Sequence, residues 1–391
     1  MRTQVAIVGA GPAGLVLSHL LAAQGIDTIV LEHRSRAYVE ARVRAGVLEQ
    51  GTVDLLRQMR VSERMDREGL IHHGVEFRFE GTGHRIPLTE LAGGRSIMVY
   101  GQQEVVKDLI AARLQTGGTL LFEAQASAIL DAHSERPRVR FVHDGTEAEL
   151  EAEFVAGCDG FHGGSRDAIP SGALTAYDKQ YPYAWLGILA SVAPSNEELI
   201  YVRHERGFAL HSMRSPSITR LYFQVDPGED LAQWSDDRIW SELSARMATH
   251  DGFQLQAGPI LEKGITAMRS YVVEPMQFGR LFLVGDAAHI VPPTGAKGMN
   301  LAVADVRNLT EALAAFYRTG ATGLLDGYSA RCLRRVWKAQ RFSWWMTSML
   351  HRFEDHSPFD QRVQLAELDY ITSSRAAGQS LAENYVGLPL D

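Results

Sequence analysis

Near its N-terminus the chain reads Val5-Ala6-Ile7-Val8-Gly9-Ala10-Gly11-Pro12-Ala13-Gly14, an apolar run followed by glycines with G-x-G-x-x-G spacing. Consecutive apolar residues are typical of a strand buried in a parallel sheet. Gly9 permits a tight turn, Gly11 lets a pyrophosphate approach the backbone, and Gly14 lets a helix pack closely on the strand. The free amides at the start of that helix suit phosphates. The stretch therefore predicts a dinucleotide-binding βαβ unit.

A second apolar run, Thr28-Ile29-Val30-Leu31, ends at Glu32. A carboxylate at this point is suited to accept hydrogen bonds from ribose hydroxyls. A chance glycine cluster and a secretory signal peptide are the alternatives. A signal peptide would not combine three glycines, a proline and this acid at these spacings. The order of strand, loop, helix and acid favours the dinucleotide site.

The second informative stretch is Gly285-Asp286-Ala287-Ala288-His289-Ile290-Val291-Pro292-Pro293-Thr294-Gly295-Ala296-Lys297-Gly298-Met299-Asn300. It follows the buried-strand run 280–284, which places Asp286 at the carboxyl end of a strand, where it can hold polyol hydroxyls. Small residues then enter a helix whose first amides lack intrahelical partners. Such a helix start stabilises negative charge on the pyrimidine end of a reduced flavin. Together with the N-terminal glycines, the stretch predicts FAD; an ordinary proline-glycine loop is the alternative.

Length and composition restrict the class of protein. The chain has 391 residues, which is long for one ordinary domain, and a formal net charge of -8. This charge gives no electrostatic footprint for nucleic acid, and no apolar run has the length of a membrane span. Cys158 and Cys332 match neither a disulfide framework nor a metal-ligand spacing. We expect a cytoplasmic protein without a metal site or a nucleic-acid or membrane partner.

The pattern along the chain predicts an α/β protein with a Rossmann-like FAD-binding domain, an antiparallel-sheet substrate domain and a C-terminal helical segment. Residues 1–175 mix strands and helices, and 276–298 return to the same domain. Residues 176–275 alternate apolar and polar positions between turns, which is typical of an antiparallel sheet. Residues 299–391 have helical periodicity.

The segment 199–225 predicts three strands with turns at 204–207 and 215–218. Alternation places Ser212 and Arg214 on one face of the second strand, and Arg220 and Tyr222 on one face of the third. If Tyr201 faces the same way, the surface suits an aromatic acid, with a guanidinium for the carboxylate. Spacing alone leaves open that both arginines face solvent, which is the commoner position for arginine.

These motifs, taken together, give the chain a family resemblance. It resembles the single-component FAD-dependent aromatic monooxygenases, most closely the hydroxybenzoate hydroxylases, over essentially its whole length. The residues that carry the resemblance are Gly9, Gly11, Gly14 and Glu32; Arg42-Val43-Arg44-Ala45-Gly46-Val47-Leu48-Glu49; Tyr100-Gly101-Gln102; Cys158-Asp159-Gly160-Phe161-His162; Gly285 to Asn300; and Glu383-Asn384-Tyr385-Val386-Gly387-Leu388-Pro389.

The resemblance implies a cofactor, a reaction and an assembly. It implies FAD, hydroxylation of 4-hydroxybenzoate at C3 with O2 and NAD(P)H to give 3,4-dihydroxybenzoate, and a homodimer. The implied FAD-binding residues are Gly9, Gly11, Gly14, Glu32, Arg42, Arg44, Val47, Gln102, Asp159, Asp286, Met299 and Asn300.

The resemblance also assigns roles around the substrate. Ser212, Arg214 and Tyr222 match positions that bind the carboxylate, and Arg220 and Thr294 complete the implied substrate site. Tyr201 and Tyr385 match the pair that contacts and deprotonates the 4-hydroxyl, which the carbonyl of Pro293 also contacts. His72 matches the outer end of the proton path. Because a phenolate is a stronger nucleophile than a phenol, the site must remove this proton, and we expect His72 to titrate near neutral pH.

The reductant has no second glycine-rich fingerprint of its own. The resemblance implies that NADPH, with NADH as the alternative, binds at His33, Arg34, Tyr38, Arg44, His162 and Arg166. NADPH-specific relatives carry arginine where this chain has His33, but Arg34 and Tyr38 still favour the 2'-phosphate.

Other functions fit parts of the sequence. A nicotinamide dehydrogenase would share the N-terminal fingerprint but would not need the segment 285–300. A flavin-binding module without catalysis, or a non-hydroxylating FAD oxidoreductase, would need no phenol-binding face. Among hydroxylases, 3-hydroxybenzoate and 3,4-dihydroxybenzoate are the alternative substrates.

Overall fold

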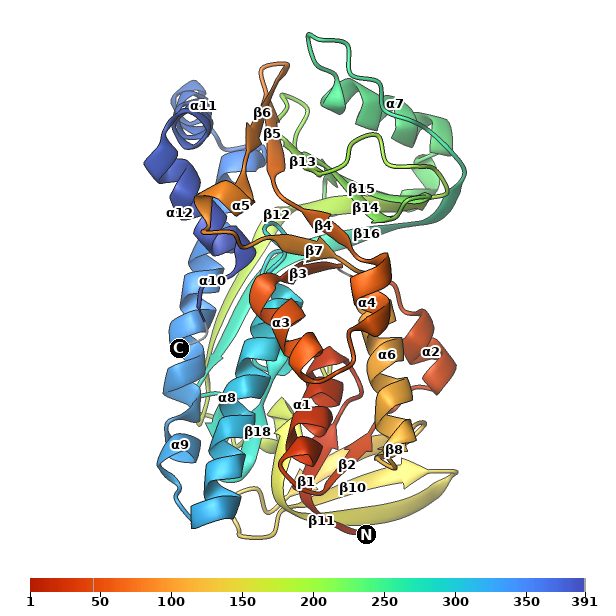
Figure 1. Cartoon of the computed structure of the whole chain (residues 1–391), viewed down its shortest axis with the longest axis vertical. Coiled ribbons are helices and arrows are strands. Elements are labelled where there is room, and N and C mark those ends of the chain that lie inside the picture. The colour runs from red at the N-terminus through yellow and green to blue at the C-terminus, as the bar shows by residue number, and fades with distance from the viewer. Residues whose placement is uncertain (45, 390–391) are drawn as a thin grey trace.

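The computed structural model describes residues 1–44 and 46–389. Ala45, within the stretch 42–49 that supports the resemblance, lies outside the described residues. Two large sheets are stacked along the long axis of the molecule, with helices between and beside them (Figure 1).

The first sheet forms around the N-terminal strand. Its strand order is β17 (Gln277–Phe278), β18 (Leu281–Leu283), β11 (Thr146–Gly157), β1 (Arg2–Val8), β2 (Thr28–Leu31) and β8 (Thr119–Leu121). The pairs β18–β11, β11–β1, β1–β2 and β2–β8 are parallel. Strands β9 (Gln125–Leu130) and β10 (Arg138–His143) extend it from β11 in antiparallel pairing. This is the predicted Rossmann-like arrangement, with β18 returning to the sheet as expected.

Helices cover this sheet and connect it to the loops above. In Figure 1, α1 (Pro12–Ala23), α6 (Gln102–Gln115) and α8 (Gly298–Thr319) stand in front of the sheet. Smaller helices lie between residues 36 and 91: α2 (Arg36–Ala41), α3 (Gln50–Gln58), α4 (Glu63–Glu68) and α5 (Leu88–Leu91). A three-stranded sheet of β3 (Val47–Glu49), β7 (Ile97–Val99) and β4 (Leu70–His72) lies between the two large sheets (Figure 1).

The second sheet carries the segment predicted to bind substrate. Its order is β19 (His289–Ile290), β16 (Ile260–Glu274), β12 (Thr175–Ala190), β15 (Ile218–Val225), β14 (Ala209–Ser215), β13 (Leu199–Val202), β5 (Val75–Phe79) and β6 (Thr82–Ile86). Strands β13, β14 and β15 pair antiparallel with the predicted turns between them. The short helix η2 (Leu231–Gln233) and α7 (Asp236–Met247) cover one face.

Two strand pairings depart from the predicted domain boundaries. The hairpin β5–β6 lies within 1–175, yet β5 pairs with β13 of the second sheet. Strand β19 lies within 276–298, yet it pairs with β16. Burial explains the position of the hairpin, because Val75 and Phe77 belong to the apolar cluster that contains Tyr201 and Tyr385. Strand patterning identifies a strand, but it does not identify the sheet that the strand joins.

The C-terminal region is helical, as predicted. It contains α9 (Gly323–Asp326), α10 (Tyr328–Leu350), α11 (Pro358–Ser373) and α12 (Arg375–Val386). Helix α8 ends at Gly320 in the left-handed conformation, and a capping box of Ser357 and Asp360 starts α11. Helix α10 runs beside both large sheets, and α12 brings the C-terminal segment to the second sheet (Figure 1). No described helix is long and apolar enough to cross a membrane.

Candidate active site

The loop between β1 and α1 has the geometry that its glycines predict. A Cβ at Gly9 would lie 2.4 Å from the carbonyl oxygen of Cys158, and one at Gly14 would lie 2.0 Å from that of Gly9. Only glycine permits these contacts, and Gly9 also has φ of 107°. A Cβ at Gly11 would meet no atom within 4 Å. The open side of this loop, before the free amides of α1, therefore fits a pyrophosphate.

Glu32 is held at the end of β2. One carboxylate oxygen accepts a hydrogen bond from the amide of Ala10 at 2.8 Å, and the other accepts from the amide of Arg34 at 2.8 Å. The ring of His33 lies 3.0 Å from the same carboxylate. Each oxygen retains acceptor capacity for a ribose hydroxyl. The carboxylate is thus oriented by the glycine loop that it would serve.

Asp286 lies at the return to the first sheet, in the short helix η3 (Gly285–Ala287). Asp305 of α8 fixes this turn, because its carboxylate accepts from the Gly285 amide at 3.0 Å and contacts the His289 ring at 2.6 Å. Asp286 itself is exposed. Desolvation by the surrounding loop raises the pKa of Asp286, while His289 and Arg44 oppose the shift. An oriented, accessible carboxylate of this kind fits the polyol hydroxyls of FAD.

The start of α8 offers backbone donors to a ligand. Gly295 and Ala296 have φ of 86° and 55°, and no side chain caps the helix. A Cβ at Gly298 would meet no atom within 4 Å. The first amides of α8 thus lack a capping side chain, and Gly298 borders open space, which fits the pyrimidine ring of a flavin.

Asn300 ties this helix start to β3. Its side-chain oxygen accepts from the Glu49 amide at 2.9 Å and from the Thr52 hydroxyl at 2.8 Å. Its nitrogen donates to the carbonyls of Val47 at 3.0 Å and Ala296 at 2.9 Å. The side chain is thus occupied by the protein, and Asn300 positions the predicted FAD residue Val47. Met299 beside it is buried.

The remaining predicted FAD residues are Arg42, Arg44, Gln102 and Asp159. Arg42 and Arg44 are exposed after α2, and Gln102 is half-buried at the first position of α6. One oxygen of Asp159 accepts from the amide and hydroxyl of Ser165 at 2.9 and 2.8 Å. The other oxygen is buried and has no partner within the described residues. An unsatisfied buried acceptor is costly, so it is suited to a hydroxyl of a bound ligand.

Strands β13, β14 and β15 bring several of the predicted substrate residues to one side of the second sheet. Strand register places Leu210 opposite both Tyr201 and Tyr222, and Ser212 opposite Arg220. Directly paired residues point to the same side of a sheet, so Tyr201, Ser212 and Tyr222 share one face. Arg214 and Arg220 are half-buried, which removes the alternative that both lie on a solvent face.

Hydrogen bonds hold the Arg214 side chain at one end of this face. Its Nη1 donates to the Ser212 hydroxyl at 3.2 Å and to the Met213 carbonyl at 2.8 Å, and its Nη2 donates to the Arg44 carbonyl at 3.3 Å. Its Nε is buried without a partner among the described residues. Burial lowers the pKa of Arg214, and the neighbouring Tyr222 opposes the shift. A buried guanidinium with an unpaired N–H favours an incoming carboxylate.

Arg220 acts on Tyr222. Its Nε donates to the Tyr222 hydroxyl at 3.0 Å, and its guanidinium lies 5.0 Å from the centre of the Tyr222 ring. Burial alone would raise the pKa of Tyr222, but Arg214 and Arg220 outweigh it and lower the pKa. Arg220 therefore positions and polarises a substrate-face phenol.

Tyr201 and Tyr385 meet at the other end of the face. Their hydroxyl oxygens are 2.5 Å apart, although the residues are 184 positions apart in the chain. Both side chains are buried, at 2% and 1% exposure. Burial raises the pKa of Tyr201 to about 12, although hydrogen bonds from Tyr385 and the Gly295 backbone lower it. Both groups are therefore neutral near pH 7, and the pair can pass a proton along one hydrogen bond.

Pro293 and Thr294 lie in the loop before α8. The Pro293 carbonyl accepts from the Ala296 amide at 2.9 Å, which leaves its second lone pair for another donor. The Thr294 side chain is buried, and its hydroxyl accepts from Thr347 of α10 at 3.0 Å. This contact holds the loop near Gly295, and hence near Tyr201.

One expectation about His72 is wrong. Its side chain is 1% exposed, and burial lowers the pKa of His72 to about 4. Neither ring nitrogen has a partner among the described residues. The imidazole is therefore neutral near pH 7 rather than half-protonated, because it lies in β4 between the sheets instead of at the surface.

The residues predicted to bind nicotinamide dinucleotide divide into two groups. His33, Arg34, Tyr38 and Arg44 are exposed around α2, with the Arg34 guanidinium 5.0 Å from the Tyr38 ring centre. His162 is also exposed. Arg166 is held by the protein, since it donates to the carbonyls of Ala287, at 2.9 Å, and Phe161.

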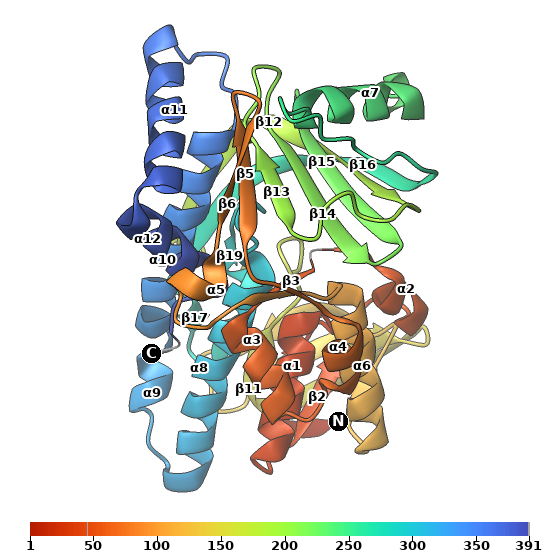
Figure 2. The same ribbon diagram turned by 45° about the horizontal axis from the view of Figure 1, so that its top comes forward.

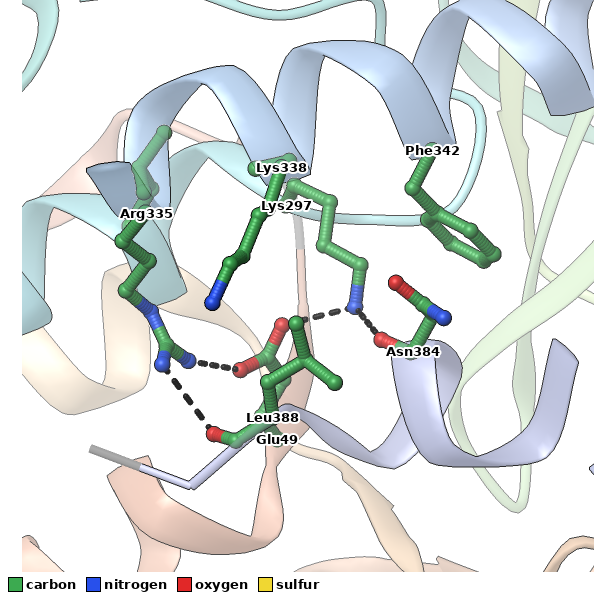
Figure 3. A pocket seen from close by; sticks show the side chains of 9 residues that line it. Glu49, Lys297, Arg335, Lys338, Phe342, Asn384 and Leu388 are labelled. Carbon is green, nitrogen blue, oxygen red and sulfur yellow. Dashed lines mark hydrogen bonds and ion pairs between the residues drawn. The ribbon is translucent and has the colours of Figure 1, made fainter. Parts of the chain in front are cut away.

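The structure adds a charged cluster that the sequence analysis did not assign. The buried ammonium of Lys297 lies 2.7 Å from one Glu49 oxygen and 3.2 Å from the Tyr385 carbonyl, and it also donates to the Asn384 carbonyl. Arg335 lies 3.3 Å from the other Glu49 oxygen (Figure 3). Burial lowers the pKa of Lys297, and Glu49 opposes the shift. The sequence signal that could have pointed to this cluster was Lys297 itself, a lysine within a run of small residues at a helix start.

Comparisons with known proteins find relatives of this chain. A family model described as FAD binding domain matches residues 2–343. The chain is 50% identical over its whole length to a p-hydroxybenzoate hydroxylase from Acinetobacter baylyi, covering 96% of that protein. It is 30% identical to a rifampicin monooxygenase from Streptomyces venezuelae over 83% of this chain and 67% of the relative.

A solved structure supports the fold. The p-nitrophenol 4-monooxygenase PnpA from Pseudomonas putida superposes with a TM-score of 0.86 over 99% of both chains, at 19% sequence identity. This similarity concerns the arrangement of both sheets and the C-terminal helices.

Proposed function

The chain belongs to the FAD binding domain family of flavoprotein monooxygenases, and we propose that it hydroxylates 4-hydroxybenzoate at C3, using NAD(P)H and O2. The product is 3,4-dihydroxybenzoate. The full-length identity of 50% to a p-hydroxybenzoate hydroxylase supports this substrate.

One arrangement supports the proposal: side chains suited to a carboxylate and side chains suited to a phenol lie at opposite ends of one face. Arg214 and Ser212 lie at one end, and the buried hydroxyl pair of Tyr201 and Tyr385 lies at the other. A ring with a carboxylate and a hydroxyl in para positions can reach both groups. The loop before α8 lies beside the phenol end, since the Gly295 backbone lowers the pKa of Tyr201.

The protein's own contribution is to activate the ring. A phenol has a pKa near 10 in water and must lose its proton to become a strong nucleophile. Tyr201 can donate a hydrogen bond to the substrate oxygen and accept one from Tyr385, which stabilises the phenolate. The buried Lys297 adds positive potential beside the Tyr385 backbone. The Tyr201 hydroxyl and the Lys297 ammonium both lower the free energy of the substrate anion.

His72 receives a changed role in this proposal. A neutral imidazole can accept a proton at one nitrogen while it releases one from the other. We therefore assign His72 as a relay that stays neutral at rest, in place of a group that titrates near pH 7.

FAD would be held by the glycine loop, Glu32, Asp159, Asp286 and the start of α8, and when bound it supplies the redox chemistry between NAD(P)H and O2. Closure of the apolar cluster around Tyr201 and Tyr385 keeps water from the reacting ring. NADPH as the preferred reductant rests on the exposed Arg34 and Tyr38. A homodimer, which rests on the family resemblance, and a cytoplasmic location, which rests on the composition of the chain, are further parts of the proposal.

Product analysis tests the proposal. Purified yellow protein is incubated with NADPH, O2 and 4-hydroxybenzoate, and the products are separated by chromatography. We expect 3,4-dihydroxybenzoate in near-equimolar ratio to NADPH oxidised. NADPH oxidation that yields hydrogen peroxide without this product would contradict the substrate, and product from 3-hydroxybenzoate or 3,4-dihydroxybenzoate alone would replace it.

A further inference from the structure

A surface cleft of about 380 Å3 lies between α8 and α10. The two helices run side by side in both Figure 1 and Figure 2, and Leu388 and Pro389 border the cleft. Its volume falls within the range of small-molecule sites, roughly 300–1,000 Å3. None of the residues that line it belongs to the predicted substrate, FAD or nicotinamide sites.

Each helix turns one face into the cleft. The lining residues are spaced i, i+3, i+4 and i+7 on both helices, which is the spacing of a single helical face. On α8 they are Ala304, Arg307, Asn308 and Glu311, and on α10 they are Arg331, Arg334, Arg335 and Lys338. A groove between packed helices is usually apolar, whereas this groove is basic.

The positive charge of the cleft is only partly neutralised. Glu311 pairs with Arg331 at 2.5 Å, and Arg335 pairs with Glu49 at 3.3 Å. Within residues 1–44 and 46–389, Arg307, Arg334 and Lys338 form no ion pair. The Nη1 of Arg331 is buried and lacks a hydrogen-bond partner within the same residues.

This concentration of charge is unfavourable for the protein alone. Arg334 and Lys338 are four positions apart on one helix, and like charges at that spacing destabilise a helix. The chain as a whole carries a formal net charge of -8, so the cleft is a local exception to an acidic surface. A bound anion would remove the repulsion and satisfy the unpaired donors.

We propose that the cleft between α8 and α10 is a binding site for a small anion with two or more negative charges, carried by phosphate or by several carboxylates. The guanidinium groups of Arg307 and Arg334 offer forked donors for such oxygens, and Lys338 adds a point charge. The inference stands independently of the proposed reaction, because no residue that carries it contacts the substrate face.

The site is tested by calorimetric titration of the FAD-loaded protein in HEPES buffer. Pyrophosphate and citrate are the two probes, and sodium chloride at equal ionic strength is the blank. We expect saturable binding of at least one probe. The stronger of the two decides between phosphate and carboxylate as the preferred group. The absence of saturable binding of both probes would overturn the proposal.

Charge-neutralising variants locate the binding. Arg334→Gln and Lys338→Gln should each weaken binding about tenfold, as expected for the loss of a charged hydrogen bond. Arg362→Gln, on the exposed side of α11, is the matched control and should change affinity less than twofold. Retained flavin absorbance and circular dichroism establish that each variant is folded. Because these side chains are exposed and lack other partners, their replacement leaves the substrate face intact.

Two other results would also overturn the proposal. Binding lost in Arg34→Gln but retained in both cleft variants would assign the probe to the nicotinamide site. Binding retained at full affinity in the double variant Arg334→Gln/Lys338→Gln would place the probe outside the cleft.

Discussion

Replacing Tyr201 with phenylalanine should separate flavin reduction from hydroxylation. The change removes a hydroxyl that lies 2.5 Å from that of Tyr385 and keeps the ring, which stacks 5.6 Å from Phe77. Packing is therefore preserved, and the loss is confined to one buried hydrogen bond. In the proposed mechanism the Tyr201 hydroxyl also donates a hydrogen bond to the substrate phenolate. The variant therefore removes that second hydrogen bond from the substrate anion.

The magnitude follows from the environment of the hydroxyl. A buried hydrogen bond to a charged group contributes about 1.5–3 kcal/mol. One pKa unit corresponds to about 1.4 kcal/mol, so the pKa of the bound substrate phenol should rise by about 1–2 units. Below that pKa the phenolate population falls about 10–100-fold. Hydroxylation should fall by a similar factor, while NADPH is still oxidised and hydrogen peroxide is released.

Two measurements check this reasoning. Ultraviolet difference titration of bound 4-hydroxybenzoate reports its pKa, and chromatography reports product formed per NADPH oxidised. Tyr181→Phe is the matched control, because it removes a phenol hydroxyl that hydrogen-bonds to Ser270 at 3.1 Å instead of to Tyr385. An unchanged substrate pKa in Tyr201→Phe, or undiminished product yield, would refute the phenolate argument.

Further predictions concern the substrate, cofactor and loop contacts. Arg214→Lys should weaken 4-hydroxybenzoate binding about 10–100-fold in a flavin fluorescence titration, because an ammonium cannot replace the planar fork; unchanged affinity would remove Arg214 from the site. Gly14→Ala places a Cβ 2.0 Å from the Gly9 carbonyl and should abolish FAD retention, whereas Gly323→Ala, whose Cβ meets nothing within 4 Å, should retain it. Asp305, at 2.6 Å, outweighs burial and raises the pKa of His289 above 6.5. The stabilisation that the His289–Asp305 pair gives the folded protein is therefore complete below pH 6.5, and it is lost as the pH rises through the raised pKa of His289. The melting temperature of His289→Asn should therefore depend less on pH across that range. An equally steep profile in His289→Asn would assign the pH dependence to other groups.

Local patterns were sufficient for several parts of the site. The glycine loop, Glu32 and Asp286 were identified because each depends on residues close in sequence: a strand, a turn and a helix start. The alternation of Ser212, Arg214, Arg220 and Tyr222 also predicted a common face, since side chains alternate along a strand with a period of two. The register of β14 and β15 places Ser212, Arg220 and Tyr222 on one side of the sheet, whereas an irregularity between Met213 and Ser215 leaves Arg214 outside the paired register.

Contacts between residues that are far apart in the chain could not be predicted from local sequence patterns. The meeting of Tyr201 with Tyr385 spans 184 residues, and that of Glu49 with Lys297 spans 248. The tyrosine pair was expected only from the family resemblance, and the Glu49–Lys297 pair was missed. Neither residue spacing nor composition encodes which side chains meet across a core.

The sequence alone thus determined the cofactor class, the order of the elements and the chemical character of the substrate face, because these follow from backbone freedom, strand alternation and residue type. Only the tertiary structure decided the electrostatics of the site. His72 is buried and neutral, Lys297 is a buried cation behind Tyr385, and the hairpin β5–β6 joins the second sheet. The physical reason is that a pKa and a strand partner depend on burial and on neighbours from elsewhere in the chain.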